Sequence, residues 1–329
     1  MIKSHVVVLA ILTILCSISC NNSTGPGTGP SWTSVQLPGG ALYHEVVFKN
    51  QLEGWVVGDS GRIFHTSDAG NTWSAQASGT GLGLSCASFV DARVGWAGGA
   101  SGIIIRTTDG GVRWNVQRQP DETTGRILSM YLVDGQTGWA VSNLGMILHT
   151  SDSGTSWTFQ VSGTQWAITS IWFVDDRRGW AVTANRDFLS TSDGGLHWSV
   201  STLPFSSPLL LTDLFFLNKN IGWIATNITA SNAIQTGTPI MRTTDGGITW
   251  NAQATLPILG VGAIYFLDGN VGWLAGSNMV FRTSDGGLTW LTEHQADAAI
   301  FVSLSFTDAN HGWVLSAFGQ ILRYDTNTP

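Results

Sequence analysis

The residues of this chain that could perform chemistry recur at fixed places. Six of its 22 acidic residues stand in one short motif: Ser or Thr, Asp, any residue, Gly, two further residues and Trp. They are Asp68, Asp109, Asp152, Asp193, Asp245 and Asp285, and Asp325 stands at a seventh such place. One carboxylate per turn is too few for a calcium loop. Asp, Ser and Thr side chains do stabilise tight turns by bonding nearby backbone N–H groups. We therefore expect these aspartates to be structural.

The motif resembles the Asp-box of β-propellers, S/T-x-D-x-G-x-T/x-W, which joins the third and fourth strands of a blade. Asp-boxes also occur in sialidases and other glycoside hydrolases, so glycan binding or glycoside hydrolysis is the alternative function. A sialidase would need an arginine triad, a Tyr–Glu pair and an acid/base Asp. Tyr43 and Glu45 lie two residues apart, but no partner set or carboxylate pair accompanies them. We expect no enzyme, and no cofactor or metal, because the histidines lack metal-ligand spacing.

A periodic basic position is the main candidate for binding. Arg106, Arg242 and Arg282 lie three residues before an Asp-box aspartate, and Arg323 is shifted by one in the last unit. One interpretation is a basic stripe that captures a partner. The other is that each arginine stacks on a Trp or pairs with a neighbouring acid. Trp166, in a connection between units, either packs on the next blade or contacts a partner.

The elements that position these residues form a repeat. Successive Asp-box aspartates are 40 to 52 residues apart, which indicates one supersecondary unit repeated. A second marker, Gly-Trp, occurs seven times, at Trp55, Trp96, Trp139, Trp180, Trp223, Trp273 and Trp313. Four short strands per unit predict an all-β, seven-bladed propeller with four antiparallel strands per blade, spanning 32–329. The last unit lacks a fourth strand, so we expect the segment Trp32 to Gln36 to complete it and close the ring.

The N-terminal segment predicts export. Residues 1–20 contain a basic start, an apolar run and small residues, as an export signal does. Ser19-Cys20 is similar to a bacterial lipoprotein cleavage site, with Cys20 acylated; an ordinary signal is the alternative. Residues 21–31 have the composition of a flexible tether. We expect a monomer in the cell envelope, lipid-anchored on the periplasmic or cell-surface face. The formal charge of −7 argues against a surface that binds nucleic acid.

Two motifs together point to one propeller family. Gly-Trp-x-[Val/Ala/Leu]-x-Gly is followed by Gly-x-Ile-x-Arg-Thr-[Ser/Thr]-Asp-Gly-Gly-x-Thr-Trp, most closely at 102–111, 242–250 and 282–290. Over 32–329 the chain resembles the photosystem II stability and assembly factors. The resemblance implies a non-catalytic scaffold that binds a protein partner, such as one assembling a membrane complex. It also implies that arginines at the Arg106 position contribute to a positive patch. Nothing in the sequence indicates chlorophyll.

Overall fold

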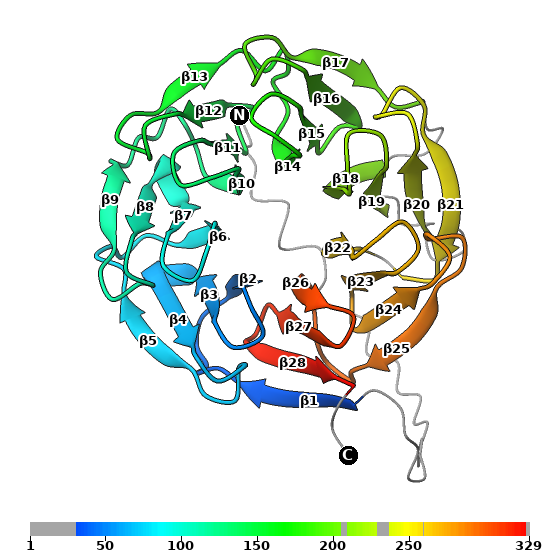
Figure 1. The fold of residues 1–329 in the computed structure, drawn as a ribbon, viewed down its shortest axis with the longest axis horizontal. Helices are drawn as coiled ribbons and strands as arrows, with labels where there is room; N and C mark the ends of the chain where they lie inside the picture. The colour runs from blue at the N-terminus through cyan, green and yellow to red at the C-terminus, as the bar shows by residue number, and fades with distance from the viewer. Residues whose placement is uncertain (1–30, 205–208, 229–236, 259, 327–329) are drawn as a thin grey trace, which may run out of the picture. The chain divides into compact units, whose positions relative to one another are not determined.

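The computed structural model describes residues 31–204, 209–228, 237–258 and 260–326. Within these residues the strands form seven antiparallel sheets of four strands each. The sheets are blades arranged around a central axis, each with its first strand innermost (Figure 1). The prediction of an all-β, seven-bladed propeller is therefore confirmed. Cys20, residues 1–20 and nearly all of the proposed tether lie outside the described residues.

Each of the first six blades is a simple meander of consecutive strands. Blade 1 holds β2 (Tyr43–Phe48), β3 (Gly54–Gly58), β4 (Arg62–Thr66) and β5 (Ser74–Ala77). Blade 2 holds β6 (Leu84–Phe89), β7 (Gly95–Gly99), β8 (Ile104–Thr107) and β9 (Asn115–Arg118). Blade 3 holds β10 (Ile127–Leu132), β11 (Gly138–Ser142), β12 (Ile147–Thr150) and β13 (Thr158–Gln160). Short 3₁₀ turns, η1 (Asp59–Gly61) and η2 (Ala100–Gly102), link the middle strands of blades 1 and 2.

The remaining blades follow the same plan. Blade 4 holds β14 (Ile168–Phe173), β15 (Gly179–Thr183), β16 (Asp187–Thr191) and β17 (Ser199–Thr202). Blade 5 holds β18 (Leu209–Phe216), β19 (Gly222–Ile228), β20 (Thr238–Thr243) and β21 (Asn251–Leu256). Blade 6 holds β22 (Ala263–Phe266), β23 (Gly272–Gly276), β24 (Met279–Thr283) and β25 (Leu291–Gln295). Blade 7 holds β26 (Phe301–Asp308), β27 (His311–Ser316) and β28 (Gln320–Asp325), together with β1 (Ser31–Gln36).

The first strand of the propeller closes the ring. β1 pairs antiparallel with β28 over six residues, from Ser31 opposite Asp325 to Gln36 opposite Gln320. Leu37, directly after β1, is 1% exposed and its N–H donates to the Gly319 carbonyl. This pairing confirms that the N-terminal strand completes the last blade. Because β28 would otherwise be an open edge, the pairing satisfies a row of backbone groups.

The Gly-Trp pairs hold neighbouring blades together. The Trp223 ring stacks on Phe266 of the next blade at 3.6 Å and 8°, and its N–H donates to the Gly286 carbonyl at 2.9 Å. The glycine before each indole is required by packing within the blade. A Cβ on Gly272 would lie 2.5 Å from the Phe266 ring, which is far inside contact distance. Six of the seven Gly-Trp tryptophans stack in this way on a phenylalanine of the next blade. The exception is Trp96, because blade 3 has Leu132 at that position, and Gly138 accordingly packs on Leu132.

Candidate functional site

The Asp-box carboxylates are used within their own turns. In blade 5, Asp245 accepts hydrogen bonds from the Thr249 N–H at 2.9 Å and from the Thr243 hydroxyl at 2.8 Å. Bonds from the Thr249 hydroxyl and N–H lower the pKa of Asp245 to about 2. The Thr243 hydroxyl also accepts from the Gly247 N–H at 2.9 Å. Such a carboxylate stays ionised and locally bonded, so these aspartates hold turns.

The Asp-box pattern is confirmed, but one position was wrongly assigned to it. The bonding hydroxyl lies two residues before the aspartate, as Ser/Thr-x-Asp predicts, and is a threonine in all six copies: Thr66, Thr107, Thr150, Thr191, Thr243 and Thr283. Asp325 is not a seventh Asp-box aspartate. Tyr324 pairs with Gly312 as Thr283 pairs with Gly272, which places Asp325 one residue too early. Its carboxylate instead accepts from Arg323 at 2.9 Å.

The predicted basic residues lie over the indoles of their own blades. The guanidinium carbon of Arg106 is 4.7 Å from the Trp96 ring centroid, and Arg242 and Arg282 are similarly placed over Trp223 and Trp273, at 5.3 and 5.5 Å. Cation–π contact of this kind stabilises the cation on the ring face. The stacking interpretation is therefore correct for these three arginines.

The four arginines differ in what else they bind. Arg242 donates to the Gly269 carbonyl at 3.4 Å, and Arg282 lies 3.6 Å from the Glu293 carboxylate. Arg323 donates to Asp325 and to Asn71 of blade 1. Arg106 makes no hydrogen bond or ion pair with any described residue, and burial lowers its pKa. An arginine stays charged even so, which leaves the Arg106 guanidinium as the uncommitted cation of the four.

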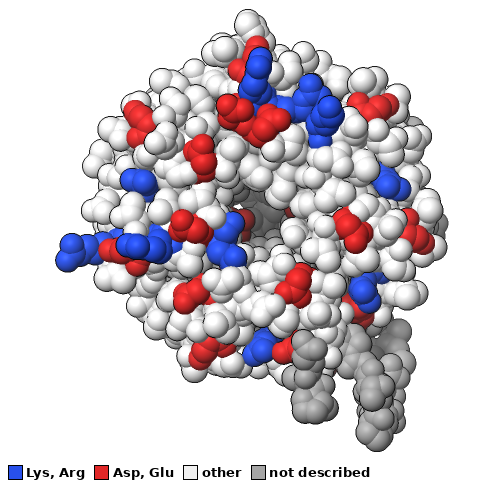
Figure 2. Space-filling view, in the orientation of Figure 1, with Lys and Arg blue, Asp and Glu red and all other residues white. Residues whose placement is uncertain are grey.

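These cations do not form one continuous surface. Arg242, Arg282 and Arg323 come from the adjacent blades 5, 6 and 7, whereas Arg106 comes from blade 2. Figure 2 shows the Lys and Arg side chains of one face in several separate groups, with mostly uncharged surface between them. Whether any of the four binds a partner remains a prediction.

Trp166 lies in the connection between β13 and β14, and its side chain is 53% exposed. A Cβ on Gly145 would lie 3.0 Å from the Trp166 carbonyl, so the connection touches the loop between β11 and β12. That loop exposes Leu144 and Met146 at 46% and 36%. Trp166 therefore stands beside other exposed apolar side chains, and its role in binding stays a prediction.

Two acidic residues near the axis of the propeller have a raised pKa. They are Glu45 and Asp213, on the innermost strands of blades 1 and 5. Burial raises the pKa of Glu45 to about 8, with a smaller contribution from Asp213, whose own pKa is raised by burial. Glu45 accepts from the Ala87 N–H at 2.6 Å, and Asp213 from the Ile264 N–H at 3.0 Å. Each partner N–H is on the inner edge strand of a following blade. The two carboxylates therefore satisfy an otherwise unpaired strand edge.

In other blades, serine hydroxyls accept the equivalent backbone N–H groups of the next inner strand. Ser303 accepts from the Val46 N–H at 3.1 Å, and Ser129 from the Ile171 N–H at 3.4 Å. Because a shared structural task explains Glu45 and Asp213, no glycosidase pair follows from them. Among the described residues, no group of three or more His, Cys, Asp or Glu is placed to hold a metal ion. In the same part of the chain, no helix has the length and apolar character needed to cross a bilayer.

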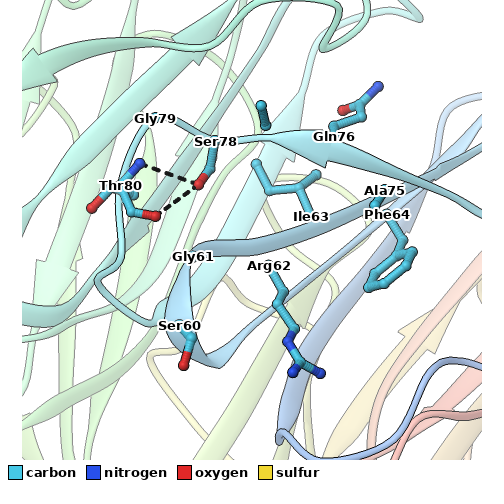
Figure 3. Close-up of a pocket in the computed structure, with 11 residues that line it drawn as sticks. Ser60, Gly61, Arg62, Ile63, Phe64, Ala75, Gln76, Ser78, Gly79 and Thr80 are labelled. Atoms are coloured by element: carbon cyan, nitrogen blue, oxygen red, sulfur yellow. Dashed lines mark hydrogen bonds between the residues drawn. The ribbon is translucent and has the colours of Figure 1, made fainter.

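One surface cleft, of about 470 Å³, lies between β4 and β5 of blade 1 (Figure 3). Most of its polar side chains already have partners. The Ser78 hydroxyl bonds the Thr80 backbone, Arg62 donates to the Gly39 carbonyl, and Gln76 bonds Gly110 and Trp114 of blade 2. With these groups engaged, the cleft offers little to a polar ligand.

The architecture and the turn chemistry define a seven-bladed Asp-box propeller. A family model described as photosynthesis system II assembly factor YCF48 matches residues 80–165. Over these residues the chain is similar to that family, as the motifs predicted. No curated protein sequence matches it.

Solved structures of several functions share the fold. A structure described as YCF48 bound to D1 peptide is 23% identical, with a TM-score of 0.73, covering 90% of this chain and 97% of its own. YCF48 from Cyanidioschyzon merolae is 21% identical, with a TM-score of 0.72 and coverages of 91% and 99%. A virginiamycin B lyase from Staphylococcus aureus is 15% identical, with a TM-score of 0.72 and coverages of 90% and 99%. At these identities the likeness shows the fold, and function must come from the site.

Proposed function

We propose that this propeller is a non-catalytic module that binds a protein partner, and that Arg106 contacts a carboxylate of that partner. The observation that carries the proposal is the uncommitted guanidinium of Arg106, held on Trp96 without a hydrogen bond or ion pair to any described residue. A stacked, oriented guanidinium loses little freedom on pairing with a carboxylate. One structural neighbour, YCF48, is described as bound to D1 peptide, which supports a peptide segment as the kind of ligand.

Arg242, Arg282 and Arg323 take part less directly in this proposal. Each of them already has a partner from its own or a neighbouring blade. A partner protein would have to replace those bonds before using them. Trp166, which is half exposed, follows the fourth strand of blade 3 and so lies at the face opposite to the Asp-box turns and Arg106. It would contact a partner only at that other face.

We also propose that the protein is exported and held at a membrane of the cell envelope through a lipid on Cys20. The support is the sequence of residues 1–20, which ends in Ser19-Cys20. Anchoring would bring the propeller to membrane-bound partners, as assembly of a membrane complex requires. No glycosidase function is proposed, because the carboxylates that stand out are engaged with backbone N–H groups.

The test compares the Arg106→Gln variant with the unchanged protein in the amount of partner protein that each captures from solubilised membranes. Loss of a charge-assisted bond should weaken capture by about 10- to 100-fold, with little change in melting temperature. Arg177→Gln is the matched control, because Arg177 is exposed and its side chain has no hydrogen-bond partner among the described residues. Equal capture by all three proteins would refute the role of Arg106. Capture of no protein at all, with binding to a glycan array, would refute the protein-binding function.

A further inference from the structure

A second cleft, of about 530 Å³, lies where the ring closes. One wall is the sheet face of blade 7, formed by β1 and β28. The other wall is residues 294–298, at the end of β25 and in the connection to blade 7. No Asp-box turn is present in blade 7, because its outer strand comes from the opposite end of the chain. The cleft is therefore a product of the seam.

Side-chain size on β1 makes the hollow. Trp32, Ser34 and Gln36 alternate along the strand and so point to the same side of the sheet; all three line the cleft. The small Ser34 sits between two long neighbours, opposite Leu322. Trp32 is fixed at one end by Tyr324, with ring centroids 4.9 Å apart. This leaves a depression with an aromatic wall.

Five polar side chains of this cleft are free. Among the described residues, the side chains of Ser34, His294, Gln295, Asp297 and Gln320 have no hydrogen-bond partner. They differ in this from the engaged side chains of the cleft in blade 1. A concave site with several unpaired donors and acceptors around an aromatic wall is the usual form of a small-ligand site.

The chemistry of the lining selects the ligand. No Lys or Arg lines the cleft, so it offers no cation for a phosphate or carboxylate. Burial lowers the pKa of His294, which keeps its imidazole neutral with one donor and one acceptor. Amide groups of Gln295 and Gln320 can each donate and accept, as vicinal hydroxyl groups require. Phe318, 55% exposed at the rim, adds a flat apolar face.

We propose that this seam cleft is a binding site for a neutral saccharide. The C–H face of one sugar ring would lie against Phe318 and that of another ring against Trp32, because these aromatics stand at opposite ends of the cleft. The hydroxyl groups would bond the free amides, the imidazole and Asp297. The site is distinct from Arg106, which is on blade 2. It would give a protein-binding propeller a second, lectin-like function at the surface where glycans occur.

The test is calorimetric titration of the full chain with cellotriose, maltotriose and chitotriose at millimolar concentrations. We expect at least one to bind, and Phe318→Ala to weaken that binding by 10-fold or more. This variant keeps the Phe318 carbonyl that accepts from Gln36, so the seam should stay closed. Phe159→Ala is the matched control, because Phe159 is 56% exposed on blade 3 and should leave binding unchanged.

A second variant distinguishes a loss of binding from a loss of folding. Gln295→Ala, at an exposed side chain without hydrogen-bond partners, should also weaken binding without lowering the melting temperature. The proposal is overturned if none of the three saccharides binds even at ten times the millimolar concentrations of the first titration. It is also overturned if both variants bind the saccharide as tightly as the unchanged chain does. Binding of peptides but of no saccharide at this cleft would overturn it equally.

Discussion

Replacing Glu45 by Gln should change how the stability of the propeller depends on pH. Glu45 is on β2, and its carboxylate accepts the Ala87 N–H of the next blade at 2.6 Å. Burial raises its pKa from 4.5 to about 8. The folded protein therefore holds a proton on Glu45 between these values, where the unfolded chain has lost it. Stability linked to this proton is present below pH 4.5 and is lost as pH rises toward 8.

The size of the effect follows from the two pKa values. A pKa of 4.5 unfolded and about 8 folded corresponds to a loss of roughly 3.5 kcal/mol between pH 5 and pH 8. Glu45 keeps partial access to solvent, which reduces the cost of its charged form. We therefore expect a difference of about 1 to 3 kcal/mol, or roughly 2 to 6 °C in melting temperature for a domain of this size.

The assay is thermal unfolding of both proteins at half-unit steps from pH 5 to pH 8. Glutamine keeps a carbonyl oxygen for the Ala87 N–H but has no proton to lose. The variant should match the unchanged protein at pH 5 and become progressively more stable above it. The Asp-box aspartates titrate in both proteins, so their effect cancels in the difference. Parallel curves, separated by a constant amount, would show that Glu45 is not protonated in the folded state.

Two further predictions concern packing and location. Gly272→Ala should lower the melting temperature by several degrees, at a cost of about 1 to 3 kcal/mol, because the new Cβ would lie 2.5 Å from the Phe266 ring. Gly269→Ala, with nothing within 4 Å of its Cβ, is the control in the same blade, and an equal loss there would refute the packing argument. Cys20→Ser should move the protein from the membrane fraction to the soluble fraction and stop incorporation of labelled palmitate. Membrane retention without the label would show a different anchor.

Much of the fold could be predicted because its signals recur. The Gly-Trp pairs and the Asp-boxes repeat at nearly constant spacing, and each serves the same contact in most of the blades. The strand from Ser31 could be placed in blade 7 because the last unit lacks a fourth strand. The threonine two residues before each Asp-box aspartate, as at Thr243, could be predicted because the Asp-box pattern has a Ser or Thr there.

The candidate sites were harder to predict because their partners come from other blades. Arg106 and Arg242 occupy the same position of the repeat, yet only Arg242 reaches a carbonyl, that of Gly269 in blade 6. The sequence around either arginine does not contain that difference. Glu45 likewise bonds a backbone group 42 residues away. The seam cleft depends on both ends of the chain meeting, so no local pattern could reveal it.

Function should be sought at the positions where one blade differs in its contacts from the equivalent positions of the other blades. In a regular blade the Gly-Trp indole donates to an Asp-box carbonyl of the next blade, as Trp223 does to Gly286. Blade 7 has no such turn, and Trp273 donates instead to Glu293 at 3.3 Å. A position that every blade fills alike is constrained by the ring and cannot easily adapt to a ligand. Arg106 and the seam cleft differ from their counterparts, so binding there would not disturb the contacts that hold the blades together.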